Sequence, residues 1–424
     1  MQIRALREDE IEQSIEHVSF VFGKPGHLRF RHHMTDDSTF APEQSRVCVA
    51  DGRIVSYVRV SDRPIHIGFA VVRMGGVGAV TTHPDYRGRG YSTTLLWDAV
   101  RYMEHASYDL SMLFTGIPRH YARVGWAPFP EHSFRLVAAE PPSLDAPYTV
   151  RDFDERRDLD AVIDIYNRYN EQRSGAMARS RQHWLDQHSR DLGILPSWVV
   201  ERHARLSTRP ANGPGAHPSE VVAYLRGSAT ELHELAYLPE HQQAVVPICA
   251  RAMREAPQAA SRSPAEVSPQ GEPLIRGDLT KSHPALEFLA QWSPRPIRHE
   301  ETEGMMLRVI RLAPLMQKIA PVLEQRLSRA GLLPRRRAIC IREQGQAARI
   351  VVEGNHLHVE AEDGGDVILE PGTRNFFKLL LGDSIFTQLR ELIPGAQPIA
   401  PDDAALLDLL FPKQEPVYYG CDHF

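Results

Sequence analysis

The sequence has few cysteines, no long apolar run and no strong net charge. Its four cysteines, Cys48, Cys249, Cys340 and Cys421, lie far apart, and no two have Cys-x-x-Cys spacing. A structural zinc site is therefore not expected, and such sparse cysteine is typical of a reducing compartment. No apolar run reaches the ~18 residues that a membrane span needs. The net charge of -5 gives no basic footprint for nucleic acid.

The first ten residues, MQIRALREDE, are charged and lack the apolar core of a signal peptide. We therefore expect a cytoplasmic protein that has neither a nucleic acid nor a membrane as its partner. The 424 residues are too many for one hydrophobic core and predict roughly two to four domains. The histidines His83, His105 and His120 show no metal-ligand spacing, so no metal is expected.

Residues 77–92, VGAVTTHPDYRGRGYS, carry the strongest functional signal. A strand is expected over 77–82, then a turn, then a glycine-containing loop that opens a helix. Backbone N–H groups at the start of a helix have no partner inside it, and with the helix dipole they bind anions, phosphate above all. The helix is predicted from apolar residues that recur on one face, namely Leu95, Leu96, Ala99, Val100 and Met103.

The residues of this loop suit a bulky anion. Arg87 and Arg89 add positive charge, and Gly88 and Gly90 allow a close approach of the backbone. The alternative is an ordinary strand–turn–helix whose arginines are solvated.

Arg87, Gly90 and Ser92 take the defining places of the pattern Arg-x-x-Gly-x-(Gly/Ala). The loop thus resembles the pyrophosphate loop of the GNAT acetyltransferases. Ser92 departs from that pattern only mildly, because serine is small. The resemblance implies acetyl-CoA as cosubstrate. Val80 and Thr82 are then expected to hold the pantetheine arm through backbone groups, in the manner of an added strand, and the alternative for both is plain sheet pairing.

The first unit, residues 1–147, has the element order of a GNAT domain. A helix is expected over 8–22, a hairpin over 46–60 with its turn at Asp51-Gly52, and a strand over 65–73. Gly75-Gly76 is expected to turn that strand into the strand of the loop motif. The resemblance implies a mixed α/β sheet in which acetyl-CoA lies between two splayed neighbouring strands.

The second unit, residues 148–300, repeats this order: a short strand, an amphipathic helix, and a hairpin interrupted by the Pro/Gly-rich loop 206–219. No glycine or arginine precedes its later helix, so we interpret it as a degenerate GNAT-like domain. The third unit, 301–424, has a strand over 304–312, a helix over 315–330, a three-stranded meander and short helices near 374–381 and 383–393. That order resembles a sterol-carrier-like domain.

Together the three units resemble the enhanced intracellular survival (Eis) family of acetyltransferases. The expected fold is therefore α/β (α+β), with tandem GNAT folds followed by a sterol-carrier-like domain. The resemblance implies an N-acetyltransferase, with aminoglycosides among the substrates of the family, and a homo-oligomer, often a hexamer. It is most specific at the loop, at residues 120–126 and at the C-terminal tail.

Acetyl transfer to an amine requires a base for the amine and an acid for the leaving thiolate. Tyr121 is the candidate acid, because a tyrosine pKa of about 10 is close to that of an alkyl thiol. Residues 121–126, YARVGW, match the segment that carries the general acid in the family. The alternative for Tyr121 is a packing role.

The candidate base is the α-carboxylate of Phe424, which the Eis resemblance brings into the active site of the first unit. Aromatic residues that flank the tail would anchor it. The alternative is a frayed terminus, and Asp422 or His423 could be the base instead, His423 having a pKa nearer neutrality. Asp36-Asp37 could attract a cationic amine but are expected in a solvated turn.

The sequence therefore predicts an acetyl-CoA-dependent N-acetyltransferase that acts on a primary amine of a small polyamine or an aminoglycoside-like substrate, by direct attack in a ternary complex. One alternative is an acetyltransferase of protein lysines or N-termini. Another is a non-catalytic lipid-binding or scaffold protein, which is disfavoured because strands 349–353 and 356–360 alternate apolar with charged residues.

Overall fold

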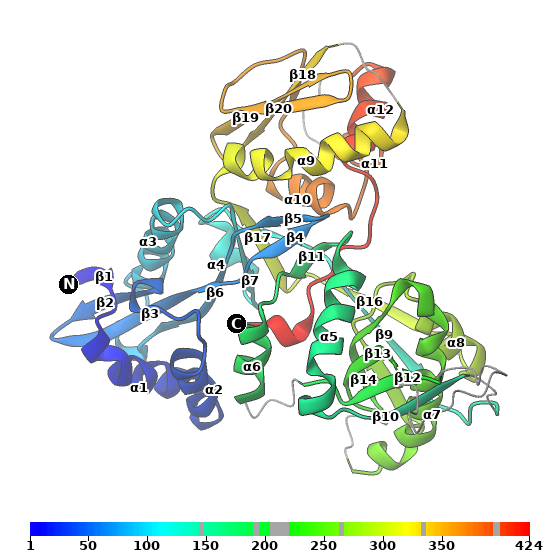
Figure 1. The fold of residues 1–424 in the computed structure, drawn as a ribbon. Coiled ribbons are helices and arrows are strands. Elements are labelled where there is room, and N and C mark those ends of the chain that lie inside the picture. Colours follow the sequence, from blue (N-terminus) through cyan, green and yellow to red (C-terminus); the bar gives the residue numbers. More distant parts are fainter. Residues whose placement is uncertain (144–146, 190–194, 204–219, 263–266, 332–335, 393–398) are drawn as a thin grey trace, which may run out of the picture.

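The chain folds into three units in a computed structural model that describes all residues except 144–146, 190–194, 204–219, 263–266, 332–335 and 393–398 (Figure 1). The blue first unit and the green second unit lie beside each other, and the yellow-to-red third unit lies above them. The loop expected over 206–219 falls outside the described residues. None of the helices in the described part of the chain is long and apolar enough to cross a membrane.

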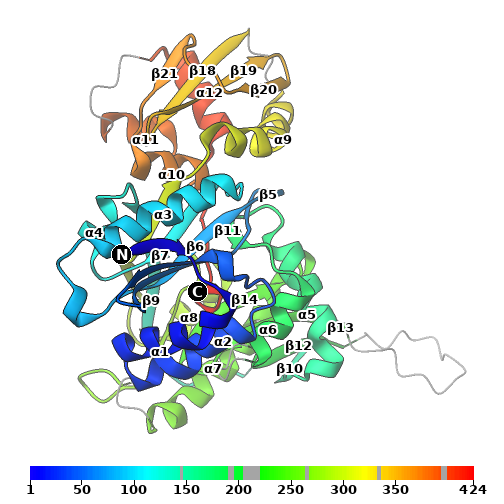
Figure 2. The same cartoon turned by 90° about the vertical axis from the view of Figure 1, so that its left-hand side faces the viewer.

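The first unit is built on a seven-stranded mixed sheet. Its strands, in sheet order, are β1 (Gln2–Ala5), β2 (Ser45–Ala50), β3 (Arg53–Asp62), β6 (Met74–Thr82), β7 (Leu110–Phe114), β17 (Met305–Val309) and β8 (Ala127–Pro128). Successive side chains of β3 serve opposite faces. Val58 and Val60 pack with α3 (Tyr91–His105), whereas Tyr57 packs with α1 (Ile11–Phe22). Helix α1 and its neighbour α2 (Lys24–Thr35) therefore lie across the sheet from α3 (Figure 2).

A second seven-stranded sheet forms the second unit. Its strands, in sheet order, are β10 (Tyr148–Asp152), β12 (Trp198–Arg202), β13 (Glu220–Gly227), β14 (Glu231–Tyr237), β15 (Leu274–Gly277), β9 (Glu131–Val137) and β16 (Arg298–Thr302). Its helices are α5 (Glu155–Asn170), α6 (Arg181–Ser189), α7 (Val245–Ala260) and α8 (Pro284–Trp292). The expected hairpin of the second unit is formed by β12 and β13, which pair antiparallel.

The sheets cross the unit boundaries expected at 147/148 and 300/301. Strand β9 precedes the first boundary but pairs with β15 and β16 of the second sheet. Strand β17 follows the second boundary but pairs with β7 and β8 of the first sheet. A small third sheet joins the units again, because β11 (Ser174–Met177) pairs with β4 (Ile65–Ile67), which pairs with β5 (Ala70–Val72).

The third unit has a four-stranded sheet in the order β20 (His356–Glu360), β19 (Gln346–Glu353), β18 (Arg337–Glu343) and β21 (Val367–Leu369). Its helices are α9 (Leu312–Ala330), α10 (Thr373–Leu381), α11 (Phe386–Leu389) and α12 (Pro401–Leu410). Asp109, the residue before β7, ties this unit to the first, because its buried carboxylate accepts from Arg311, the N-cap of α9, and from Lys318 in the second turn of that helix.

The mixed α/β fold is confirmed, and so is the hairpin at Asp51-Gly52, where both residues have positive φ. Two local predictions were wrong. Residues 65–73 form two strands around Gly68 rather than one, and Gly75-Gly76 lie inside β6 rather than in a turn. Helix α12 and strand β21 were not predicted, and Ile393, the expected end of the last short helix, lies outside the described residues.

His283 begins helix α8 from within the core of the second unit. Its Nδ1 accepts the Ala285 N–H at 3.1 Å, and its Nε2 donates to the Leu235 carbonyl at 2.9 Å. These two partners require the neutral ring with its proton on Nε2. Burial, which disfavours the charged form, lowers the pKa of His283 to about 4.

We expect His283 to make folding stability depend on acid. Its pKa is lower in the folded chain than in the unfolded one, so its contribution is present above about pH 6.5 and is lost as the pH falls toward about 4, by roughly 3 kcal/mol in all. The urea midpoint of His283→Gln is expected to change less between these pH values than that of the wild type. The exposed His356→Gln variant is the control, and an unaltered pH dependence in His283→Gln would contradict the assignment.

Candidate active site

Strands β6 and β7 part from each other at the centre of the first sheet. They pair in parallel only over residues 74–76 and 110–112, so Val80 and Thr82 lie beyond the last pair. A strand edge that has left its neighbour can hold an extended ligand through backbone hydrogen bonds. The splay expected from the GNAT resemblance is therefore present. The Thr82 carbonyl also accepts a hydrogen bond from Arg87 Nε at 3.3 Å.

A bulge in β6 lies where the strands part. Tyr57 and Arg59 of β3 pair with Thr81 and Gly78, so two residues of β6 oppose one residue of β3. Ala79 inside the bulge has a φ of 51°, which is uncommon for a residue with a side chain. A bulge turns backbone N–H groups away from the regular ladder. The backbone at Ala79 and Val80 can therefore be directed into the space between β6 and β7.

The loop before α3 has the shape of an anion cradle. Gly88 and Gly90 have φ of 75° and 78°, and no atom lies within 4 Å of where a Cβ would stand on either. Gly90 is the N-cap residue of α3 and supplies no side-chain cap, so the first N–H groups of the helix face the open loop. This arrangement fits a pyrophosphate group.

The other residues expected in this loop are arranged around it. Arg89 Nη2 donates to the Asp85 carbonyl at 3.1 Å, and its guanidinium lies 4.9 Å from the centre of the Tyr86 ring. Arg87 and Arg89 are both exposed. Ser92 also contacts a residue outside the loop, because its Oγ lies 2.9 Å from His120 Nε2. That contact connects the start of α3 to α4 (Pro118–Ala122), the helix that carries Tyr121.

Tyr121 lies on the α3 side of the sheet. It is 8% exposed and belongs to the apolar cluster that also holds Val124 and Trp126. Burial raises the pKa of its phenol, and a hydrogen bond with Thr115 opposes that rise. The group is therefore protonated throughout the neutral range, which is the state that a general acid needs.

Phe424 lies on the opposite face of β6. A Cβ on Gly76 would stand 2.6 Å from its ring, and a Cβ on Gly78 would stand 3.1 Å from its backbone oxygen. On the α3 face, by contrast, a Cβ on Gly75 would meet Met103. The ring of Phe424 also lies 5.7 Å from that of Phe114 at the end of β7. The end of the chain therefore reaches β6 beside the bulge.

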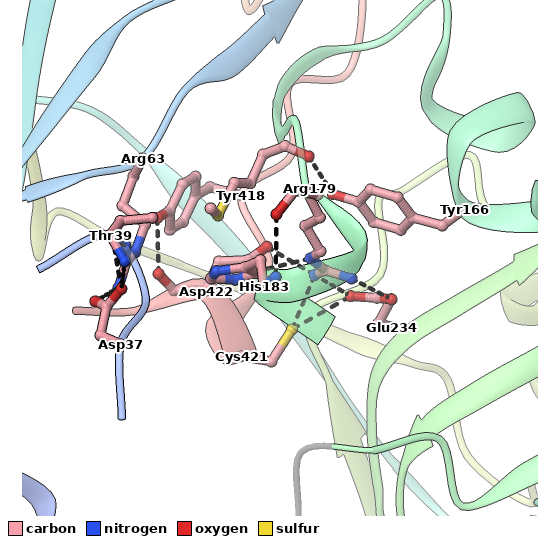
Figure 3. Close-up of polar contacts among 12 residues, drawn as sticks. Asp37, Thr39, Arg63, Tyr166, Arg179, His183, Glu234, Tyr418, Cys421 and Asp422 are labelled. Atoms are coloured by element: carbon pink, nitrogen blue, oxygen red, sulfur yellow. Dashed lines mark hydrogen bonds and ion pairs between the residues drawn. The ribbon is translucent and has the colours of Figure 1, made fainter. Parts of the chain in front are cut away.

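The two other candidate bases differ in their surroundings. The ring of His423 stacks on Phe114, with 3.7 Å between centroids. The carboxylate of Asp422 is buried and bound by Arg179, which follows β11 (Figure 3). Burial alone would raise the pKa of Asp422, but Arg179 holds it well below its ordinary value. Asp422 is thus committed to an ion pair. Asp37, expected in a solvated turn, is likewise buried, between Arg59 and Arg63.

A cavity of about 520 Å³ lies where the three units and the tail meet. Met112 of β7 and His423 line it, so it adjoins the end of the chain. Its acidic lining residues outnumber its lysines, Lys281 and Lys413. The acidic residues are Glu131, Asp278, Glu301, Asp383 and Glu415. Among the described residues, no group of three or more His, Cys, Asp or Glu side chains is arranged to hold a metal ion.

Sequence reasoning missed three features of this site: the room made by Gly76 and Gly78, the strained Ala79, and the pairing of Arg179 with the tail. Glycines within a strand are a known signal of close backbone approach, so the first could have been found. The other two depend on contacts between distant segments and left no local signal.

Comparisons with known proteins agree with this geometry. Residues 2–129 match the family model of an acetyltransferase (GNAT) domain. A search of curated proteins gives no significant match. Solved structures that resemble the whole chain include the three described next, and at their low sequence identities the likeness shows a shared fold.

The first is a conserved protein of unknown function from Enterococcus faecalis, described as a probable N-acyltransferase, with a TM-score of 0.73 and 16% identity over 100% of this chain and 99% of that one. The second is a GCN5-related N-acetyltransferase from Kribbella flavida, with a TM-score of 0.67 and 17% identity over 100% and 98%. The third is Eis1 from Mycobacterium abscessus, with a TM-score of 0.63 and 14% identity over 100% of both chains.

We expect Gly76→Ala to displace Phe424. Because the new methyl group would stand 2.6 Å from the ring, overpacking is expected to cost about 1–3 kcal/mol of unfolding free energy. Removing Phe424 from the same variant is expected to restore most of that loss, as measured by urea unfolding of all four chains of the double-mutant cycle. Gly116→Ala, where no atom lies within 4 Å, is the control. An equal cost with and without Phe424 would show that the ring does not occupy this place.

Proposed function

We propose that this acetyl-CoA-dependent N-acetyltransferase, whose first unit is a GNAT domain, acetylates a primary amine of a small polyamine or an aminoglycoside-like molecule. Attack is direct, within a ternary complex. The observation that carries the proposal is the position of Phe424. Its backbone oxygen lies beside Gly78, across β6 from the face where Tyr121 is buried. An acid and a base thus flank the space between β6 and β7.

Phe424 is the proposed base. Its α-carboxylate takes the proton that the amine gives up as the amine attacks the thioester carbon, directly or through one water. A carboxylate is a weak base, so its effect comes mainly from position. The ring packed on Gly76 and the Phe114 contact hold that position.

Tyr121 is the proposed acid. As the carbon–sulfur bond breaks, its phenol gives its proton to the leaving thiolate, and the proton from the amine then returns through solvent to restore the phenol. One proton thus passes from nitrogen to sulfur overall. The backbone N–H groups of Ala79 and Val80 would donate a hydrogen bond to the thioester oxygen, which gains negative charge during attack. Val80 and Thr82 would hold the pantetheine arm, and Arg87, Gly88, Arg89, Gly90 and Ser92 the pyrophosphate.

The charge of the large cavity supports a cationic acceptor. Its volume lies within the range of small-molecule sites, and His423 brings its wall next to Phe424. Carboxylates such as Asp278, Glu301 and Glu415 would attract the remote ammonium groups of a polyamine. A substrate without additional ammonium groups would not be attracted by these carboxylates.

Finer features of the Eis family belong to the same proposal. The order of α9, the β18–β20 meander and the later helices supports a sterol-carrier-like third unit. We also propose a cytoplasmic homo-oligomer, hexameric as the resemblance implies. We also propose three domains with boundaries at 147/148 and 300/301. Strand β9 of the first domain then belongs to the sheet of the second, and strand β17 of the third domain belongs to the sheet of the first.

Removing either proposed proton-transfer group is expected to slow turnover. Tyr121→Phe and a chain that lacks Phe424 are each expected to lose roughly 10²- to 10⁴-fold in kcat, the usual contribution of acid–base catalysis, with little change in the KM for acetyl-CoA. Thiol release with spermidine and with an aminoglycoside measures this. Tyr148→Phe in the second unit is the control. Full turnover without Phe424 would move the base elsewhere.

Reversing the charge of the loop is expected to affect binding rather than chemistry. Arg87→Glu places a carboxylate against the expected pyrophosphate, so the KM for acetyl-CoA is expected to rise roughly ten- to a hundred-fold. Calorimetric titration with CoA is expected to show the same loss. Arg329→Glu, an exposed position on α9, is the control. An unchanged KM in Arg87→Glu would remove this loop from the cofactor site.

A further inference from the structure

Arg179 binds two carboxylates at once, one from its own unit and one from the tail. It donates to Glu234 of β14 at 2.9 and 2.6 Å and to Asp422 at 2.8 and 2.7 Å. None of the three side chains is exposed. Figure 3 shows the guanidinium between the two acids. We call these three residues the tail clasp.

The tail clasp balances buried charge. Arg226 also lies 3.6 Å from Glu234, so two arginines face two carboxylates. His183 lies 3.5 Å from Asp422, and burial lowers its pKa, which favours the neutral ring. Loss of the Asp422 charge would leave two buried guanidinium groups beside the single carboxylate of Glu234, and an uncompensated buried charge is strongly unfavourable.

Aromatic rings fix the orientation of the Arg179 guanidinium. It lies 4.1 Å from the centre of the Tyr166 ring and 4.7 Å from that of Trp184. Tyr419 of the tail adds a third ring at 5.5 Å. A planar fork held between rings can bind each carboxylate in one geometry only. The position of Asp422 is therefore set by the second unit.

The neighbouring tail residues are held in the same way. The Val417 N–H donates to the Ser174 carbonyl at 3.0 Å, and the Tyr419 hydroxyl donates to Asn170 at 3.0 Å. Phe424 follows Asp422 by two residues, which span at most about 7 Å when extended. The place of Phe424 against β6 thus depends on where the clasp holds Asp422.

We propose that Arg179 is a positioning residue: by holding Asp422, it places the α-carboxylate of Phe424 beside Gly78. The second unit, in which no glycine or arginine lies in residues 239–244 before α7, thereby supplies the support for the base of the first unit. This inference rests on the proposed role of Phe424 in catalysis.

The test compares two aspartates that each pair with an arginine through both oxygens. Asp422→Asn weakens the tail clasp. Asp158→Asn is the matched control, because Asp158 is unexposed and bound by Arg151 at 2.6 and 2.7 Å but lies in the first turn of α5, at the end of that helix opposite to Asn170, which contacts the tail. Release of Phe424 by a carboxypeptidase measures the freedom of the tail without reference to catalysis. Acetylation kinetics and the urea midpoint are measured on the same proteins.

Asp422→Asn is expected to speed the release of Phe424 and to lower kcat, each by about ten-fold or more, with the KM for acetyl-CoA within about two-fold. Asp158→Asn is expected to leave both rates near the wild-type values at a similar loss in urea midpoint. Asp422→Glu, which keeps the charge, is expected to recover part of both effects. If Asp422→Asn does not fold, Arg179→Lys can be compared with Asp158→Asn in its place. The lysine ammonium would replace the guanidinium, which donates to both carboxylates.

A slow, wild-type release of Phe424 from Asp422→Asn would overturn the proposal, as would equal effects of Asp422→Asn and Asp158→Asn on every measurement. The chain that lacks Phe424 separates this failure from a failure of the proposed function. If that chain retains full kcat, Phe424 is not the base. Faster release of Phe424 from Asp422→Asn would then still show that the clasp positions it.

Discussion

The route of the last eleven residues constrains the rest of the molecule. The Gln414 N–H donates a hydrogen bond to the Gly382 carbonyl of the third unit at 2.7 Å, and the Val417 N–H donates one to the Ser174 carbonyl of the second unit. The ring of Phe424 packs on Gly76 of the first unit. One short segment therefore touches all three units in turn. A glycine allows the close approach at each contact point, because a Cβ on Gly382, Gly175 or Gly76 would stand less than 3.0 Å from an atom of the tail. Gly175, for example, would place a Cβ 2.6 Å from the Val417 carbonyl.

Features encoded by neighbouring residues could be predicted from the sequence. The loop before α3 follows from the spacing of Arg87, Gly88 and Gly90, and the hairpin between β2 and β3 follows from Asp51-Gly52, because turn chemistry and helix periodicity act over a few residues. The rule that a pair of glycines marks a turn failed at Gly75-Gly76, which lie inside β6. There glycine serves packing within a strand, against Met103 on one face and Phe424 on the other, and those partners are distant in the sequence.

Some features of the candidate site could likewise be predicted from the sequence, and others depend on tertiary contacts. The resemblance identified Tyr121 and Phe424 as candidates, and the structure places them on opposite faces of one sheet. Nothing local indicated that Arg179 would bind the tail or that Ala79 would adopt a positive φ, because both depend on tertiary contacts. The buried Asp37 shows the same limit. An Asp-Asp pair looks like a solvated turn in sequence, and only the fold brings Arg59 and Arg63 against it.

Strands β9 and β17 each pair with the sheet of another unit, and this pairing affects how the protein folds during synthesis. On the ribosome, β7 emerges long before β17, so an edge of the first sheet stays without its neighbour while the whole second unit is synthesised. An open strand edge is a site for mispairing and aggregation. Residues 1–147 therefore do not constitute a portable module: a transplanted or truncated first domain would need Met305–Val309 supplied as a separate strand before its sheet could close.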